Sequence, residues 1–347
     1  MLSTATCKGS RRDSRRALAG YLAAEGPNHP DVANALVELA AALEALDRPQ
    51  LAGEALDRAL AILRRSADDL DLVRLRLQAR IARAGLDRAS GRYGRADRGL
   101  RAALAEVRRR LPRRDPLHLA VLNNLGVLRK AQGRYAEALA YYRRAQPLLT
   151  RRDREARATL EHNLGGSEHA RGRYAAAEPH ARRAVTLRAA ARGTSHPAWA
   201  ADVAALAAVV EARGRFDEAA ALYRRALAVF GRTLGARSLE VGLNLAGLAA
   251  LEQQRGRPAR ARALYARALP VLEAHLGRHH PDVALTVNNL GVLERDDGRP
   301  TRARALFRRT AESFARVLGA RHPHTVLARG NLRAVPAALK RTGPTRR

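Results

Sequence analysis

The sequence predicts an all-α protein, a solenoid built from antiparallel helix pairs. The first observation is a Gly-Arg dipeptide that recurs six times, from Gly91 to Gly298, in steps of 42, 39, 42, 42 and 42 residues. The second is that apolar residues on both sides of each dipeptide recur at helical spacing, whereas no segment alternates apolar and polar residues as a half-buried strand would. Since one helical hairpin cannot bury its own apolar faces, such repeats must stack.

The clearest repeat lies near the C-terminus, where two amphipathic helices flank one turn. Apolar residues of 283–290 lie on one face of the first predicted helix, and those of 303–310 lie on one face of the second. Gly298 can close the first helix in a left-handed conformation, and Pro300 can open the next helix. We therefore expect a helical hairpin here and in each of the other copies.

Small residues mark the packing sites of both helices. After each turn, an aromatic residue or proline is followed by Ala three residues on and by Ala or Thr seven further. The second repeat departs from the rule for first helices, because Arg83 and Ala84 take the position. A large residue at one of these sites would cost roughly 1–3 kcal/mol. In first helices, an apolar residue followed by a small one stands eight residues before the turn, and we expect the small residue to let the helix backbones approach closely. These pairs are Leu39-Ala40, Leu125-Gly126, Leu164-Gly165, Leu206-Ala207, Leu248-Ala249 and Leu290-Gly291.

These residues resemble the tetratricopeptide repeat family. Leu-Gly, then Gly-Arg-Tyr, then Ala-x-x-x-Tyr, between Leu125 and Tyr142, matches the signature of that family. The longer period is similar to the kinesin light chain variety, whose linkers read Leu-Gly-x-x-His-Pro-Asp, as residues 276–282 do. Helices of that variety carry Asn-Asn-Leu, as at 123–125 and 288–290. The resemblance spans nearly the whole chain and implies a right-handed superhelical solenoid that serves as a protein-interaction scaffold.

The chain is expected to divide into three parts. Residues 1–14 match nothing in the repeat and should be disordered, whereas 336–347 form a basic tail. Residues 15–335 should form the solenoid, with a partial helix pair, about seven repeats and a capping helix. Because residues 15–31 run parallel to 266–282, the start of the chain aligns with the second helix of a repeat. Our hypothesis is that the polypeptide is a shortened relative of a longer repeat protein, such as a signalling protein with a repeat tail.

Composition and motifs argue against several functional classes. One cysteine, Cys7, leaves no internal disulfide framework, and no run of 18 apolar residues is present, so we expect a soluble, cytoplasmic protein. No phosphate-binding glycine loop, nucleophile elbow or His-Glu-x-x-His motif occurs, and we predict no enzymatic activity, no cofactor and no small-molecule substrate. His162 and His169 lie two turns apart on one helix face. A metal site is the alternative there, but groove histidines are the favoured interpretation, because the spacing is not a recognised ligand pattern.

The resemblance implies a concave groove lined by the first helices. Residues two before, two after and five after the buried Leu share a face that points away from the partner helix. Asn amides would hold the backbone of an extended peptide, Lys130 and Arg295 would take its acidic groups, and Glu211 a basic one. The alternative is that the amides only bond a neighbouring helix. The groove candidates are Asn123, Asn124, Lys130, His162, Asn163, His169, Glu211, Gln253, Asn288, Asn289 and Arg295.

The charge of the chain indicates a competing function. A formal net charge of +31 and a pI near 11.6 are typical of proteins that bind nucleic acid or another polyanion. Many arginines fall in second helices, on the expected outer surface, and no aromatic residues are interleaved with them for base stacking. Lysine occurs only at positions 8, 130 and 340, which indicates a GC-rich genome as much as a selected patch. We expect nonspecific polyanion binding at low salt, and nucleic-acid association through the convex arginine face stays open as the alternative function.

Overall fold

The structure, a computed structural model, describes residues 13, 16–46, 48–66 and 69–335. Over these residues the chain is helical and contains no strand, which confirms the predicted all-α class. The expected basic tail and, apart from residue 13, the expected N-terminal disordered segment lie outside the described residues. Among the helices described, none is long and apolar enough to cross a membrane.

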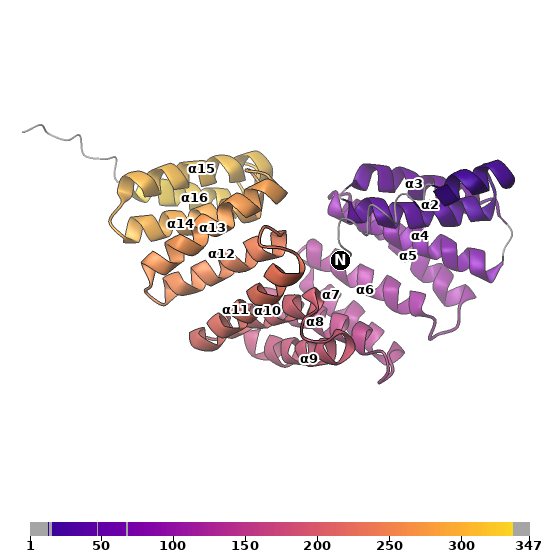
Figure 1. The fold of residues 1–347 in the computed structure, drawn as a ribbon, viewed down its shortest axis with the longest axis horizontal. Coiled ribbons are helices and arrows are strands. Elements are labelled where there is room, and N and C mark those ends of the chain that lie inside the picture. Colours follow the sequence, from indigo (N-terminus) through magenta and orange to yellow (C-terminus); the bar gives the residue numbers. More distant parts are fainter. Residues whose placement is uncertain (1–12, 14–15, 47, 67–68, 336–347) are drawn as a thin grey trace, which may run out of the picture. The chain divides into compact units, whose positions relative to one another are not determined.

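The chain forms two compact units, Met1–Ala191 and Arg192–Arg347. In the first unit, a helical segment at 16–24 precedes antiparallel helices that pack in consecutive pairs (Figure 1). The helices are α2 (Pro30–Ala45), α3 (Pro49–Leu63), α4 (Leu70–Ala89), α5 (Tyr93–Arg110), α6 (Pro116–Ala131), α7 (Tyr135–Ala145), the short 3-10 helix η1 (Gln146–Leu148), α8 (Arg154–Ala170) and α9 (Tyr174–Arg192).

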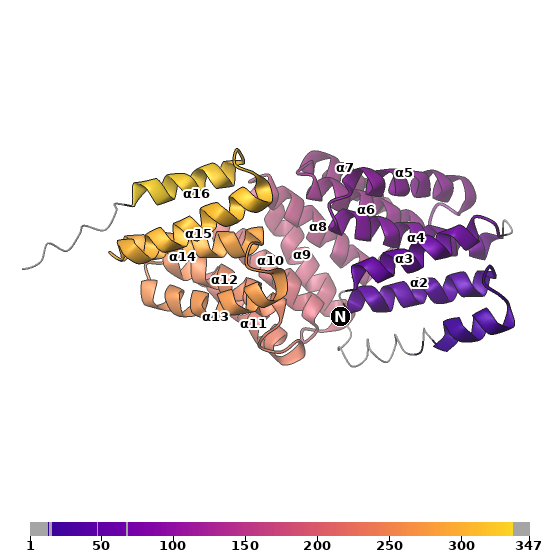
Figure 2. The same cartoon turned by 90° about the horizontal axis from the view of Figure 1, so that it is seen from above.

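The second unit repeats this arrangement and ends on a single helix. Its pairs also lie side by side in the view turned by 90° (Figure 2). Arg333 is exposed on the last helix. The helices are α10 (Pro197–Ala212), α11 (Phe216–Thr233), α12 (Leu239–Gln254), α13 (Pro258–Leu276), α14 (Pro281–Asp296), α15 (Pro300–Leu318) and α16 (Pro323–Ala334).

The Gly-Arg turns have the predicted backbone conformation. Their glycines have positive φ angles between 68° and 76°, which an L side chain rarely adopts. The arginine has a role that the sequence analysis did not assign, because its amide donates to the carbonyl oxygen five residues earlier and closes the helix end. In three turns its guanidinium also bonds the buried acid at that position, in the pairs Arg92–Asp87 (2.8 Å), Arg257–Glu252 (3.3 Å) and Arg299–Glu294 (3.4 Å).

The small residue of the first helix makes room for an aromatic ring in two repeats. A Cβ added to Gly126 would lie 2.2 Å from Cε1 of Tyr142, and one added to Gly291 would lie 2.8 Å from Cε1 of Phe307. Both rings are fully buried. The expected close approach of helix backbones is found instead at Gly165, whose added Cβ would lie 3.3 Å from backbone atoms of α9. The reason for a small residue therefore differs between repeats.

The second repeat forms a complete first helix although Arg83 breaks the small-residue rule. Helix α4 has 20 residues, and Arg83 is buried within an ion-pair cluster. Its Nη1 donates to Oδ1 of Asp87 at 2.6 Å, and its Nε donates to Oδ1 of Asp57 at 2.8 Å. A buried guanidinium is tolerated when its donors are satisfied by carboxylates in this way.

The histidines of the His-Pro linkers cap the helices that follow them. In each, the imidazole Nδ1 accepts a hydrogen bond from the backbone amide two residues on, at 3.1–3.3 Å. Such a cap satisfies one of the free amides at a helix N-terminus. Asp115 and Ser238 take the same place before α6 and α12. The capping histidines are His29, His196, His280 and His322.

Candidate peptide groove

The predicted groove residues lie on the first helices of both units. In the first unit they belong to α6 and α8, which contact each other, and in the second unit to α10, α12 and α14. Side chains at the chosen spacing share one face of each helix because 3.6 residues make a turn. Each unit therefore has its own set of candidates, and their contacts separate those that hold the fold from those that are available to a ligand.

Asparagine amides connect neighbouring first helices in both units. Nδ2 of Asn163 on α8 donates to Oδ1 of Asn123 on α6 at 2.8 Å. Nδ2 of Asn331 on α16 donates in the same way to Oδ1 of Asn288 on α14, at 3.0 Å. In the described part of the chain, the Nδ2 groups of Asn123 and Asn288 have no acceptor. Each amide pair thus bonds two helices and still offers donors to a ligand.

Two further asparagines are engaged inside the fold. Nδ2 of Asn124 donates to the carbonyl oxygen of Ala120 at 2.9 Å, within helix α6. Asn289 interacts with the hydroxyl group of Tyr265, whose pKa is raised by burial. Of the two, only Asn289 has a contact with a neighbouring helix, as the helix-bonding alternative expects, whereas the Asn124 amide bonds its own helix.

Glu211 and Gln253 accept hydrogen bonds from the second helix of their own hairpin. The hydroxyl of Tyr223 donates to Oε2 of Glu211 at 3.0 Å, and that of Tyr265 donates to Oε1 of Gln253 at 3.2 Å. Burial raises the pKa of Glu211, although hydrogen bonds from Tyr223 and Gln254 act in the opposite direction. In both hairpins the acceptor stands twelve residues before the tyrosine, a relation that the sequence analysis missed.

Lys130 occupies the same place in hairpin α6–α7 but cannot accept a hydrogen bond. Its side chain crosses from α6 to α8, where a Cβ added to Gly166 would lie 2.8 Å from the Lys130 Nζ. Burial lowers the pKa of this half-buried ammonium group. Within the described residues Lys130 has no carboxylate partner, and the buried hydroxyl of Tyr142, twelve residues later, has no hydrogen-bond partner.

The remaining candidates are two histidines and one arginine. His162 and His169 are half-buried on α8, and the ring of His169 lies 5.2 Å from that of Tyr174, between centroids. Over the residues that the structure describes, no three His, Cys, Asp or Glu side chains gather to hold a metal ion. Arg295 is exposed, and its Nε donates to Oδ1 of its neighbour Asp296 at 2.9 Å.

Comparison with known proteins identifies the repeats and their fold. Two family models, both described as tetratricopeptide repeat, match the chain. One matches residues 156–230 and 199–274, and the other matches residues 118–145 and 283–324. Together the matches span more than half of the chain. Among curated proteins, no sequence matches this chain.

Several solved structures are similar to this chain. One from Parabacteroides merdae is 16% identical, with a TM-score of 0.56 over 87% of this chain and 97% of that one. The quorum sensor NprR from B. thuringiensis matches in its apo form at 14% identity, a TM-score of 0.61, and 91% and 80% of the two chains. NprR in complex with its cognate peptide NprX matches at 13% identity with a TM-score of 0.59, over 93% of this chain and 82% of that one. Repeats assigned to a kinesin light chain of Podosopora anserina match at 20% identity with a TM-score of 0.48, over 58% of this chain and 96% of that one.

Proposed function

Because the chain belongs to the tetratricopeptide repeat family, we propose that it is a non-enzymatic interaction scaffold that binds an extended, acidic peptide segment of another protein. The ligand lies along α6 and α8, in a groove whose central residues are Asn123, Asn163, Lys130 and Gly166. The observation that carries the proposal is the ammonium group of Lys130, which is half-buried without an anionic partner among the described residues.

An ammonium group that is partly removed from water loses hydration, and no charge in this part of the protein compensates for the loss. The lowered pKa of Lys130 expresses that cost, because burial disfavours its charged form. A ligand carboxylate beside Nζ would supply the missing charge in a partly desolvated setting, where a charge-assisted hydrogen bond contributes more than it does in water. Lys130 therefore selects an acidic group at one position of the peptide.

The amide pair beside Lys130 suits the backbone of such a peptide. Asn163 fixes the orientation of the Asn123 amide through the bond at 2.8 Å, which leaves both Nδ2 hydrogens of Asn123 for peptide carbonyl oxygens. A pre-oriented donor loses little side-chain entropy on binding. Gly166 leaves room for the lysine side chain, because a Cβ there would lie 2.8 Å from the Lys130 Nζ.

The second unit offers a weaker form of the same arrangement. Asn288 and Asn331 make an equivalent amide pair, but Arg295 is exposed and already bonded to Asp296. We therefore assign the specificity for an acidic residue to the first unit. NprR, which has the same fold, has been solved with a bound peptide, and this supports a peptide as the kind of ligand.

The test is a selection from a displayed random-peptide library, carried out at physiological salt on the wild-type protein and on two variants. We expect the wild type to enrich peptides with Asp or Glu at one fixed position. Lys130→Glu should enrich Lys or Arg at that position, because the sign of the buried charge is reversed. Arg58→Glu is the matched control, since Arg58 is an exposed arginine of α3 outside the groove; it should select the same peptides as the wild type.

Enrichment that is indifferent to Lys130→Glu would exclude Lys130 as the selecting residue. A second variant, Asn123→Ala, separates backbone binding from charge selection. It should weaken all selected peptides about tenfold, which corresponds to the loss of roughly one to two hydrogen bonds. Circular dichroism of each variant establishes that the helices are intact.

A further inference from the structure

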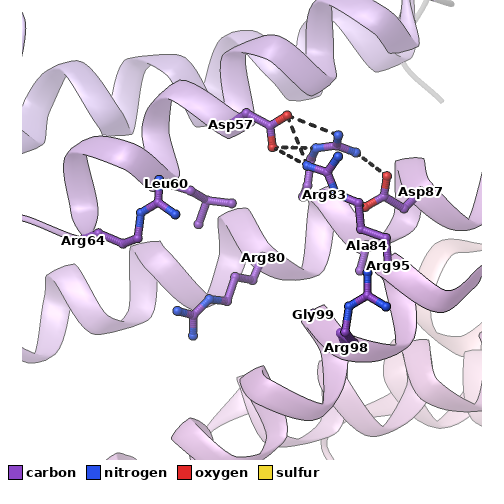
Figure 3. Close-up of a pocket in the computed structure, with 10 residues that line it drawn as sticks. All are labelled: Asp57, Leu60, Arg64, Arg80, Arg83, Ala84, Asp87, Arg95, Arg98 and Gly99. Carbon is purple, nitrogen blue, oxygen red and sulfur yellow. Dashed lines mark hydrogen bonds and ion pairs between the residues drawn. The ribbon is translucent and has the colours of Figure 1, made fainter. Parts of the chain in front are cut away.

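A cleft rich in arginine opens between α3, α4 and α5 of the first unit (Figure 3). It consists of two adjoining cavities of about 540 and about 420 Å³, and Arg64 and Arg80 line both. Seven arginines and three carboxylates line the two cavities. The groove residues of α6 and α8 do not contribute to it, so the cleft is independent of the proposed peptide site.

The three carboxylates are already engaged. Asp57 and Asp87 bond Arg83, and Arg95 bonds both acids, with distances of 3.1 Å to Oδ1 of Asp57 and 3.3 Å to Oδ2 of Asp87. Burial alone would raise the pKa of Asp57, but the hydrogen bonds and charges of Arg83 and Arg95 hold it below its usual value. These four residues form an ion-pair cluster at one end of the cleft, and Arg92 also bonds Asp87.

Glu106 neutralises part of the charge at the other end. Its Oε1 accepts from Nε of Arg76 at 3.1 Å, and its Oε2 accepts from Arg80. Arg64, Arg98 and Arg109 are exposed and have no carboxylate partner within the described ranges. The cleft therefore keeps an excess of positive charge after all of its acids are paired.

Arginines from three sides line one cavity. Arg64, which directly follows α3, Arg80 of α4 and Arg98 of α5 all line the larger cavity, and Figure 3 shows Arg64 and Arg80 apart from the bonded cluster. Small residues open this space, since a Cβ added to Gly99 would first meet Ala84, at 3.9 Å. A phosphate group presents oxygens in several directions and can bond guanidinium groups from three sides, whereas a carboxylate has only two oxygens in one plane.

We propose that this cleft binds a linear polyphosphate chain. The α5 wall runs from Arg95 to Arg109, and its two arginines without a carboxylate partner, Arg98 and Arg109, lie eleven residues and therefore about 16 Å apart. That length suits a chain with phosphate groups along its whole extent rather than one isolated phosphate. No aromatic side chain lines either cavity of the described structure, so the cleft offers phosphate contacts without a stacking surface for nucleobases.

The experiment measures the affinity of the full chain for inorganic polyphosphate by isothermal titration calorimetry at physiological salt. Tripolyphosphate and a single-stranded oligonucleotide with the same total charge as the long chain serve as comparison probes. The long chain should bind most tightly of the three. Arg64→Gln/Arg98→Gln should weaken it by about tenfold or more, because two unpaired guanidinium groups are lost.

The matched control is a double variant that removes the same number of positive charges from outside the cleft. Arg58→Gln/Arg232→Gln deletes two exposed arginines that lie outside the cleft and should weaken binding no more than about twofold. Equal weakening by both double variants would overturn the proposal, because binding would then follow net charge alone. Tighter binding of the oligonucleotide than of polyphosphate would also overturn it and would favour nucleic acid as the ligand.

Discussion

Hairpins α6–α7 and α12–α13 share one framework but differ at the position five residues after the buried leucine. In α12–α13 this residue is Gln253, which accepts a hydrogen bond from the hydroxyl of Tyr265. In α6–α7 it is Lys130, and the hydroxyl of Tyr142 is left without a partner in the described structure. An acceptor at this position therefore satisfies the tyrosine hydroxyl of the hairpin, whereas the Lys130 ammonium group cannot accept a hydrogen bond from it.

The other hairpins of the second unit follow the same relation. Glu211 accepts from Tyr223, whereas Arg295 stands twelve residues before Phe307, which has no hydroxyl to donate. The tyrosine hydroxyl twelve residues later thus finds an acceptor in two of these hairpins, at Glu211 and Gln253.

The largest effect is expected from filling the space beside the Tyr142 ring. Gly126→Ala places a Cβ 2.2 Å from that ring, so the second helix must shift, and we expect a loss of roughly 1–3 kcal/mol of unfolding free energy. Urea unfolding, with hydrogen exchange of α6–α7 to localise the change, is the measurement. Gly85→Ala is the control: nothing lies within 4 Å of its Cβ, and the helix should gain about 0.5–1 kcal/mol. Equal responses at the two glycines would contradict the ring contact.

Removing single hydroxyl groups sharpens the comparison between the two hairpins. Tyr265→Phe should lower the unfolding free energy by about 1 kcal/mol, because the bond to Gln253 is lost. Tyr142→Phe should leave stability unchanged or raise it slightly, because a buried hydroxyl without a partner disappears. Both variants are compared by urea unfolding under the same conditions. A larger loss for Tyr142→Phe would mean that its hydroxyl has a partner after all.

Glu211→Gln is predicted to have a smaller effect that depends on pH. Burial raises the pKa of Glu211 in the folded protein, so its contribution to stability is full below the unfolded pKa and is lost as the pH rises through the folded pKa. Glutamine cannot ionise and still offers an oxygen to Tyr223, as Gln253 does to Tyr265. The variant should match the wild type near pH 4 and exceed it by a few tenths of a kcal/mol at pH 7. Thermal unfolding over this pH range checks the prediction, and a constant difference would refute it.

Features with a local cause could be predicted from the sequence. The turn glycines, the paired amphipathic helices and the fold class follow from spacing within about 20 residues, and so does the placement of candidates such as Asn123 on first helices. The resemblance to tetratricopeptide repeats is confirmed by the family matches. Which candidates bind a ligand stays a prediction.

Features that depend on packing across a turn could not be predicted. Whether Glu211 meets Tyr223 depends on the angle between two helices, and the pair is visible only once that angle is known. The bond between Arg76 and Glu106 joins residues 30 positions apart, and no local pattern connects them. The sequence nevertheless contained a signal for the bonds between Glu211 and Tyr223 and between Gln253 and Tyr265, because each acceptor stands twelve residues before its tyrosine.

The most direct test is Lys130→Gln, which gives hairpin α6–α7 the residue found in α12–α13. Its unfolding free energy in urea and its affinity for a library-selected acidic peptide, by calorimetric titration, are measured on the same protein preparation. Glutamine should accept from Tyr142 and raise the unfolding free energy by about 0.5–1.5 kcal/mol, while the affinity for the acidic peptide falls at least about tenfold. A variant that is no more stable than the wild type and still binds the peptide with full affinity would contradict the division between acceptor and ligand positions.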